Sequence, residues 1–255
     1  MKLANQVALI FGGSSGIGKA TALRLAREGA TVAVVASEKL ARATAVADEI
    51  AAAGGKARGF VADVRDVQSI RSVVADVEAA LGPIEIMVYS AGVYYPTILG
   101  ELDEAKFDAM VDINFKGAFF AIDAVAGAMK THGRGRIVTL ASVAAFRGSS
   151  SYPLYAATKA AVMMLTKSLV GRLAPHGIHI NAVAPGNTAT PLNENDRLGA
   201  GSAEILAAKA AITPSGRTYS PPEEIAAAIH FLVSGEVRAM HGATLLIDEG
   251  LFAGM

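Results

Sequence analysis

The 255-residue sequence predicts an α/β fold, a single doubly wound parallel sheet of about seven strands with helices on both faces. Short β-branched runs alternate with longer segments of helical periodicity along almost the whole chain, and a glycine-rich turn joins the first run to the first helical segment. No internal repeat or low-complexity tract interrupts this alternation. The predicted strands cover residues 7–11, 31–36, 57–62, 84–90, 136–142, 179–184 and 244–248.

Turn-forming residues mark the boundaries between these elements, and they fit one domain over residues 1–255, a common size for an open parallel sheet. The longest stretch without periodicity, residues 185–203, follows the sixth strand and is rich in Gly, Asn, Thr and Pro. A long loop at the carboxyl end of a strand is more often a functional loop than a simple connection. We therefore expect a substrate lid at about 186–215. The helix-ending and helix-starting signals are Gly29, Gly54-Gly55, Gly82-Pro83 and Pro221-Pro222.

The composition argues against several functional classes. The chain has 23 basic and 23 acidic residues, so no net field attracts nucleic acid or an anionic membrane surface. The absence of cysteine excludes disulfides, thiolate catalysis and thiolate metal sites, and it is compatible with a reducing cytoplasm. The N-terminus leads into a short strand, and no apolar run approaches the roughly 18 residues that a membrane span requires. We therefore expect a cytoplasmic protein that acts on a small molecule.

The turn at residues 12–18 has the pattern of a phosphate-binding loop. It follows the apolar strand 7–11 and leads into a predicted helix at 19–28, and Gly12, Gly16 and Gly18 allow backbone to approach a ligand closely. A dinucleotide's pyrophosphate can then lie at the helix N-terminus. The alternative is a tight strand-to-helix turn that binds nothing.

Tyr155 and Lys159 are four residues apart, so on a helix they share one face. Tyrosine has a pKa of about 10, which leaves about one phenol in a thousand ionised at pH 7. A positive charge within about 4–6 Å lowers the pKa of a neighbouring acid by roughly 1–3, so Lys159 is expected to make Tyr155 a working acid or base near neutrality. Ser142, at the carboxyl end of the fifth predicted strand, is placed to donate to a substrate oxygen.

Together, the spacing Gly12-x-x-x-Gly16-x-Gly18 and the set Ser142, Tyr155 and Lys159 resemble the short-chain dehydrogenase/reductase family over essentially the whole chain. The resemblance implies a Rossmann-type fold and an NAD(P)(H)-dependent enzyme that interconverts a secondary alcohol and a ketone. It also implies a fourth catalytic residue, Asn114, which in relatives interrupts a helix and holds a water linking the lysine to solvent. Taken alone, an asparagine at position 114 is more often a helix kink or a polar cap than a catalytic residue.

The resemblance also implies a set of cofactor contacts. In the family, the glycine turn receives the pyrophosphate, a pair after the third strand contacts the adenine, a segment after the fourth strand lines the groove, and a segment after the sixth strand receives the nicotinamide carboxamide. Asp63 has the alternative role of capping a helix. The implied residues are Gly12, Ser14, Ser15, Gly16, Ile17, Gly18, Asp63, Val64, Ser90, Ala91, Gly92, Tyr155, Lys159, Pro185, Gly186, Thr188 and Thr190.

The end of the second strand bears on the choice of cofactor. NAD-preferring relatives carry an acidic residue about where Ala36 stands, and it binds the adenosine ribose and repels a 2′-phosphate. Here that carboxylate is missing, and Ser37 and Lys39 are placed to bind a phosphate. The sequence therefore favours NADP(H), with NAD(H) as a possible cofactor. In the alternative interpretation, Ser37 only caps the next helix and Lys39 is a solvated charge.

Three positions depart from the family pattern. Phe11 stands where relatives usually carry threonine before the first glycine, which removes a hydroxyl that braces the turn. Tyr89 and Ser90 stand where relatives usually carry two asparagines. Ser90 retains a small hydrogen-bonding group. Tyr89 is a larger change, and we expect it to affect how the central strands are held together rather than the reaction.

Two segments, residues 115–129 and 156–173, are apolar around more than one stripe. Relatives pair these two helices across a dimer and use the last strand and tail, here 245–255, to complete a tetramer. We therefore expect a homodimer or homotetramer, and a well-covered core face is the alternative. Two further alternatives concern function: a reductase specific for 3-oxoacyl thioesters, or a catalytically idle nucleotide-sensing or interaction protein on the same scaffold.

Overall fold

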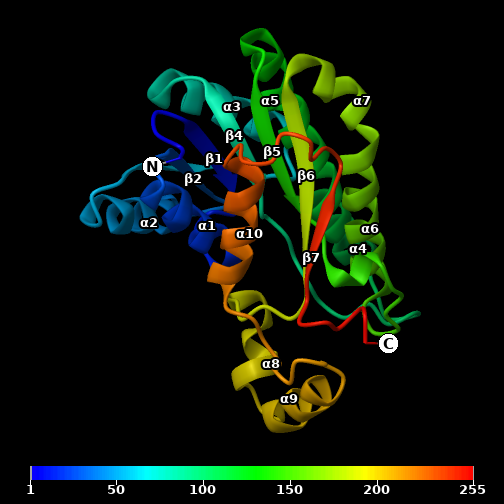
Figure 1. Cartoon of the computed structure of the whole chain (residues 1–255). Helices are drawn as coiled ribbons and strands as arrows, with labels where there is room; N and C mark the ends of the chain where they lie inside the picture. The colour runs from blue at the N-terminus through cyan, green and yellow to red at the C-terminus, as the bar shows by residue number, and fades with distance from the viewer. Residues whose placement is uncertain (1, 255) are drawn as a thin grey trace.

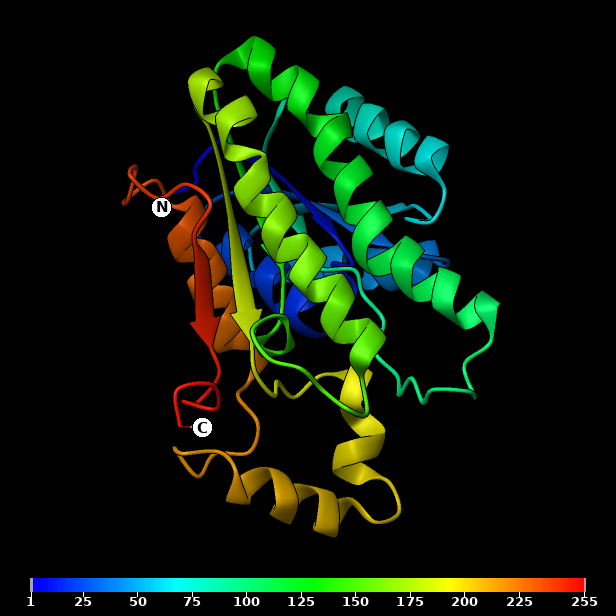
Figure 2. The same cartoon turned by 90° about the vertical axis from the view of Figure 1, so that its right-hand side faces the viewer.

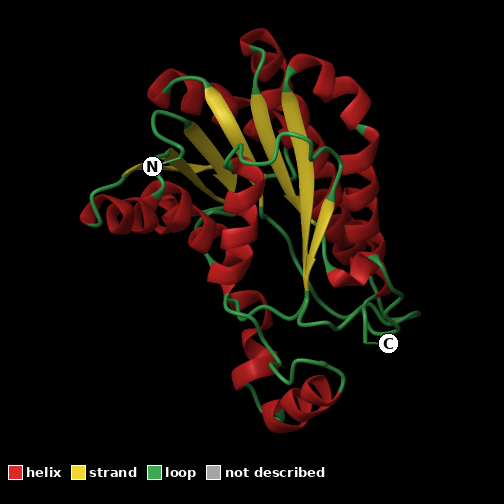
Figure 3. Ribbon diagram, in the orientation of Figure 1, coloured by secondary structure: helices red, strands yellow, loops and turns green. Residues whose placement is uncertain are grey.

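The computed structural model describes residues 2–254 and shows one seven-stranded, fully parallel sheet with helices on both faces (Figures 1 and 3). The predicted fold class is confirmed. The strand order is β3-β2-β1-β4-β5-β6-β7. The strands are β1 (Val7–Phe11), β2 (Thr31–Ala36), β3 (Lys56–Val61), β4 (Ile84–Tyr89), β5 (Gly135–Leu140), β6 (Ile178–Pro185) and β7 (Thr244–Ile247).

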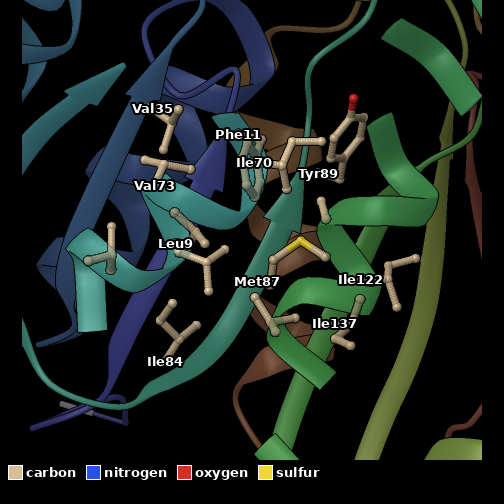
Figure 4. Packing of buried hydrophobic residues seen from close by; sticks show 14 of the residues in the cluster. Leu9, Phe11, Val35, Ile70, Val73, Ile84, Met87, Tyr89, Ile122 and Ile137 are labelled. Atoms are coloured by element: carbon tan, nitrogen blue, oxygen red, sulfur yellow. The ribbon is translucent and has the colours of Figure 1, made fainter. Parts of the chain in front are cut away.

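Two hydrophobic cores, one on each face, hold the helices to the sheet. On one face α1 and α2 pack against β1 and β2, and α10 packs against β5 and β6, and their core includes Leu25, Ile50 and Ile229. On the other face, α3, α5 and α6 cover a core that includes Leu9 and Met87 (Figure 4). Figure 2 shows the layer of α5 and α6 from the front. The helices are α1 (Gly16–Arg27), α2 (Leu40–Ala52), α3 (Val67–Leu81), α4 (Glu104–Val111), α5 (Gly117–His132), α6 (Pro153–Ser168), α7 (Val170–Leu173), α8 (Glu194–Leu198), α9 (Ser202–Ala211) and α10 (Pro222–Val233).

The predicted and observed strands agree to within two residues at each end, because buried β-branched runs are a strong signal. Three strands begin one residue earlier than predicted, and the largest difference lies at the carboxyl end of the fifth. The fifth strand stops at Leu140, so Ser142 lies just beyond it and begins a short 3-10 helix, Val143–Ala145. The first helix begins at Gly16 rather than at Lys19, so two of the three turn glycines belong to its first turn.

The topology decides where a ligand binds. All strands are parallel, so their carboxyl ends meet at one edge, and the strand order reverses between β1 and β4. Open α/β sheets bind ligands in the crevice outside the carboxyl ends at such a reversal. Helices α8 and α9 project beyond this edge (Figures 1 and 2), within the segment predicted as a lid. No helix in the described part of the chain has both the length and the apolar character needed to cross a bilayer.

Candidate active site

The glycine turn places bare backbone at the start of α1. Gly12 and Gly16 have φ values of 74° and 51°, a region that favours glycine. A Cβ at Gly18 would overlap the Gly12 carbonyl, so the third glycine allows the turn to close on itself. Ser15 precedes α1, lines the adjoining cavity and makes no capping hydrogen bond with its side chain, which leaves its hydroxyl available to an anion at the helix N-terminus.

A cavity of about 420 Å³ extends from this turn to the end of β2. Ser37 and Arg42 lie at its far end, beyond the residues of the turn. The sequence patterns did not point to Arg42, which is the third residue of α2. The signal was present: an arginine in the first turn of the helix after β2 lies close to the carboxyl end of that strand. The predicted residues that line this cavity are Gly12, Ser14, Ser15, Gly16, Ile17, Ser37, Val64, Ser90, Ala91, Gly92 and Thr190.

Three residues predicted to bind the cofactor line neither this cavity nor the second one, described below. Gly18 is buried within α1, and its role is in packing. Lys39 precedes α2 with an extended backbone, outside the cavity wall. The Asp63 carboxylate accepts hydrogen bonds from the Arg65 side chain and from its backbone amide, and the side-chain bonds are the main cause of the lowered pKa of Asp63.

The proton-transfer residues meet in a second cavity of about 300 Å³. Ser142 lies just after β5 and is buried, and Tyr155 lies in the first turn of α6 with its side chain lining the cavity. The two side chains face the same cavity, and Ser142 acts on the Tyr155 phenol so as to lower its pKa. Tyr152 lines the same cavity, but it precedes α6 and stacks on Tyr94 with ring centroids 4.3 Å apart. The geometry therefore singles out Tyr155 as the partner of Ser142.

Lys159 lies one turn after Tyr155, and its side chain is buried. Its Nζ donates to the Leu140 carbonyl oxygen at 2.7 Å and lies 5.7 Å from the centre of the Tyr155 ring. Burial lowers the pKa of Lys159 to about 8. Burial also raises the pKa of Tyr155, and the hydrogen bond from Ser142 only partly opposes this. The predicted lowering of the Tyr155 pKa by Lys159 is not seen in this structure, where loss of solvation has the largest effect on the phenol.

Asn114 lies in a π-helical turn, Asp112–Lys116, between α4 and α5, and it is almost fully buried. Its side-chain amide makes a two-way pair with the Val93 backbone, accepting from the amide at 2.8 Å and donating to the carbonyl at 3.0 Å. It also donates to the Thr158 hydroxyl at 3.2 Å, and Thr158 is next to Lys159 on α6. The fold thus brings Asn114 to the catalytic helix over a sequence separation of 44 residues.

The segment after β6 forms the remaining wall of the second cavity. Pro185, Gly186, Thr188 and Thr190 all line it, as predicted for a nicotinamide-binding segment. Side chains at the start of α8 and within it hold the segment predicted as a lid to this wall. Asn193 donates to the Thr188 carbonyl at 2.7 Å, and Arg197 donates to the Thr190 carbonyl at 3.1 Å.

The two cavities share part of their lining, Ile17, Ser90, Gly92, Val93, Thr190 and Leu192, so they form one continuous groove. At one end lie the glycine turn and Ser37, and at the other Ser142, Tyr155 and Lys159. The glycine cradle, the uncapped helix start and the length of the groove fit an extended dinucleotide whose reactive ring lies beside Tyr155. Such a groove can combine hydride and proton transfer at a single carbonyl.

Comparison with known proteins agrees with this geometry. The model of the short chain dehydrogenase family matches residues 6–200. This chain belongs to the short-chain dehydrogenase family. It is an NAD(P)-dependent oxidoreductase of the short-chain type, and the predicted family and reaction type are confirmed. The idle-scaffold alternative is not favoured, since the relatives are dehydrogenases and reductases.

Relatives of this dehydrogenase align over nearly its full length. It is 38% identical to the short-chain reductase protein NovJ of Streptomyces niveus, over 96% of this chain and 93% of that protein. It is 35% identical to an L-rhamnose 1-dehydrogenase (NAD(P)(+)) of Azotobacter vinelandii, over 100% of both chains. A 3-oxoacyl-[acyl-carrier-protein] reductase FabG of Thermotoga maritima is 36% identical, over 98% of this chain and 99% of that protein.

Solved structures match the whole dehydrogenase fold. A variant of actinorhodin polyketide ketoreductase, solved with NADPH, superposes with a TM-score of 0.91 at 32% identity and covers 99% of this chain and 98% of that one. The seven-stranded sheet and the arrangement of helices around it are therefore those of the family.

Proposed function

We propose that this protein interconverts a ketone and a secondary alcohol, with Tyr155 as the acid and base and NADP(H) as the preferred cofactor. The convergence of Ser142, Tyr155 and Lys159 at one end of a dinucleotide-sized groove carries the proposal. These residues come from the end of β5 and from α6, so only the folded chain brings them together. A nucleotide sensor has no need of a tyrosine, a serine and a buried lysine together at this end of the groove.

Each side chain has a distinct part in the reaction. When bound, the reduced nicotinamide supplies the hydride and, once oxidised, a positive charge beside Tyr155. During reduction the carbonyl carbon accepts the hydride, and the carbonyl oxygen accepts the phenolic proton of Tyr155. The Ser142 hydroxyl holds that oxygen through a hydrogen bond. The reverse reaction runs through the same groups, with Tyr155 accepting the alcohol proton.

Lys159 and Asn114 support this proton transfer. Lys159 is buried one turn from Tyr155, where its ammonium can bind ribose hydroxyls and return a proton to the phenolate. Asn114 reaches the same helix through Thr158, the residue before the lysine, in keeping with a role in relaying protons to solvent. Thr188 and Thr190 are placed to hold the carboxamide of the nicotinamide.

The preference for NADP(H) rests on the far end of the groove. Ala36 leaves no carboxylate at the end of β2, and Ser37 and Arg42 both line the cavity there. A serine hydroxyl and a guanidinium suit the extra 2′-phosphate, since charge-assisted hydrogen bonds from arginine to phosphate are among the stronger ones. In this proposal Arg42, and not Lys39 as the sequence suggested, binds the 2′-phosphate.

The substrate wall is mixed in character. Val143, Leu192 and Ile212 give it apolar surface, while Tyr94 and Asn193 offer hydrogen bonds. Relatives named for a sugar and for a 3-oxoacyl carrier substrate both fit such a wall. We therefore keep a small polar alcohol or ketone as the proposed substrate class and a 3-oxoacyl thioester as the alternative.

A spectrophotometric screen tests the proposal. Purified protein is mixed with NADPH or NADH and a panel of ketones that includes keto sugars, small hydroxyketones and a 3-oxoacyl thioester, and the reduced-nicotinamide band is followed. The reverse direction uses the matching alcohols with the oxidised cofactors. Turnover that is faster with NADPH supports the proposal. Tight nucleotide binding with no turnover of any substrate would instead identify a sensor.

We also propose a cytoplasmic homodimer or homotetramer. Phe119 on α5 and Met164 on α6 are 41% and 56% exposed, so each of these helices presents large apolar side chains on its outer side. Burial of such surface against a second copy is favourable, at about 25 cal/mol per Å². Light scattering coupled to gel filtration should give a mass of two or four chains, and Met164→Lys should lower it. A wild-type mass of one chain would refute the assembly.

A further inference from the structure

Tyr89, one of the departures from the family pattern, lies at the carboxyl end of β4 and is buried. Its neighbour in the sheet register is Phe11, the last residue of β1 and another of the departures. The two rings lie with their centroids 5.8 Å apart and their planes tilted by 39° (Figure 4). Both unusual residues therefore pack on each other at the strand reversal, directly below the cofactor groove.

The Tyr89 hydroxyl points out of this aromatic pair toward the π-helical turn. It donates to the Ile113 backbone carbonyl at 2.6 Å. Within the turn, the Gly117 amide bonds to the Asp112 carbonyl five residues back, where an α-helix would bond four residues back. A turn of this kind interrupts the regular pattern of helix hydrogen bonds and can leave a backbone carbonyl without its usual amide donor. A side chain from another element can then donate to that carbonyl.

Gly117 leaves the space that the phenol occupies. A Cβ at this position would overlap the Tyr89 hydroxyl oxygen and would also crowd the Val64 backbone carbonyl. Glycine is otherwise a poor helix former compared with alanine. The close approach of Tyr89 gives a physical reason for a glycine at the junction of the turn and α5.

The residue after Ile113 in the turn is Asn114. Its side chain is fixed on one side by the Val93 backbone and on the other by Thr158, whose hydroxyl donates to the Tyr155 carbonyl at 2.8 Å. Asn114 Oδ1 and Lys159 Nζ both face Gly92, since a Cβ built there would lie 3.3 Å from the first and 3.6 Å from the second. A shift of the turn backbone would therefore move Asn114 relative to Lys159.

We propose that Tyr89 is a positioning residue, whose hydroxyl holds the Ile113 carbonyl and so fixes the π-helical turn with Asn114 against the catalytic helix. This inference rests on the proposed role of Asn114 and Lys159 in proton transfer. Tyr89 itself touches neither substrate nor cofactor, because its ring is enclosed in the core below the groove. Burial raises the pKa of Tyr89, so the phenol stays a hydrogen-bond donor throughout the working pH range.

Tyr89→Phe tests the inference because it removes only the hydroxyl. Tyr95→Phe is the matched control, since the Tyr95 hydroxyl also donates to a helix carbonyl, that of Lys106 in α4. A second control, Phe11→Leu, removes the aromatic neighbour and keeps the Tyr89 hydroxyl. All variants are first compared with the wild type by circular dichroism, and then by amide hydrogen exchange and steady-state kinetics with NADPH and the ketone that gives the highest wild-type rate.

In Tyr89→Phe we expect the amides of residues 112–118 and of Val93 to exchange about tenfold faster, with the rest of the sheet unchanged. We expect kcat to fall by about 5- to 50-fold and the KM for NADPH to stay within about twofold, since the groove is intact. Tyr95→Phe and Phe11→Leu should match the wild type in kcat to within about threefold. A purely structural role would lower the melting temperature and leave kcat unchanged.

Unchanged exchange in the turn overturns the inference, whatever the activity. An equal loss of kcat in Phe11→Leu also overturns it, because packing and not the hydroxyl would then be responsible. If the wild type turns over no ketone, the proposed function fails, while the exchange experiment still decides whether Tyr89 holds the turn. If Tyr89→Phe exchanges faster and keeps full kcat, the brace exists but does not position the catalytic group, and the inference fails.

Discussion

The Lys159 ammonium donates a 2.7 Å hydrogen bond to the Leu140 carbonyl, which joins α6 to the last residue of β5. This bond keeps a buried positive charge at the carboxyl end of the sheet, close to Gly92 in the wall of the groove. The single hydrogen bond does not fully offset the loss of solvation, since burial still lowers the pKa of Lys159 to about 8. The site therefore carries a local destabilisation that function requires, and this destabilisation can be measured.

Stability should depend on Lys159 in a defined pH range. Its pKa is lowered by burial from 10.5 to about 8, so between these values the unfolded chain binds more protons than the folded one. Stability then rises with pH in that range, by on the order of 1–3 kcal/mol from this group. Urea unfolding of wild type and Lys159→Met from pH 7 to 10.5 should show the rise only in the wild type.

The control for this experiment is Lys56→Met, because Lys56 is exposed on the edge strand β3. Its unfolding midpoint should follow the wild-type curve at every pH. Parallel curves for wild type and Lys159→Met would show that the lysine is not held with a lowered pKa.

Tyr155→Phe should leave cofactor binding within about twofold and lower kcat by roughly 10²- to 10⁴-fold, the usual contribution of a positioned acid or base. The ring remains in place, and only the proton donor is lost. Fluorescence titration with NADPH measures binding, and the nicotinamide absorbance measures turnover. Tyr152→Phe, in the wall of the same cavity, should keep at least about a tenth of the wild-type rate. Normal turnover in Tyr155→Phe would contradict the assignment.

Arg42→Ala should weaken NADPH binding by about 5- to 30-fold and leave NADH binding unchanged, because only the 2′-phosphate needs the guanidinium. Arg27→Ala removes the same charge from an exposed position of α1 away from the groove. It should leave both affinities unchanged, apart from a small long-range effect that salt abolishes. Equal weakening of NADPH and NADH in Arg42→Ala would mean that Arg42 does not distinguish the two cofactors.

Arg197→Ala should loosen the lid at its attachment to the nicotinamide-binding segment. The Arg197 side chain bonds to Asn193 Oδ1 and to the Thr190 carbonyl, and its loss leaves the start of α8 held by Asn193 alone. We expect faster amide exchange in residues 190–198 and a KM for NADPH raised by about 3- to 10-fold. Exchange in β1 to β3 serves as the internal reference. Unaltered exchange in the lid would show that Arg197 is not its fastening.

The sequence by itself determined the strands, the parallel sheet and the family, and it predicted the residues that we propose as catalytic. The alternation of strand and helix patterns is local, and so is the glycine turn between a strand and a helix. Both can therefore be recognised without knowledge of the fold. The four-residue spacing of Tyr155 and Lys159 likewise defines their common helix face. Ser142 was predicted as the last residue of its strand, and in the structure it lies two residues beyond the strand's end.

Only the tertiary structure decided the electrostatics and the long-range contacts. Burial sets the pKa values of Tyr155 and Lys159, and burial depends on packing between elements far apart in the chain, which is why spacing alone predicted the wrong direction for Tyr155. Arg42 lines the groove because it lies in the first turn of α2. The Tyr89 hydroxyl donates to the Ile113 carbonyl, which is 24 residues away in the sequence. Local sequence patterns do not specify such neighbours, since they are set by how the sheet and helices pack.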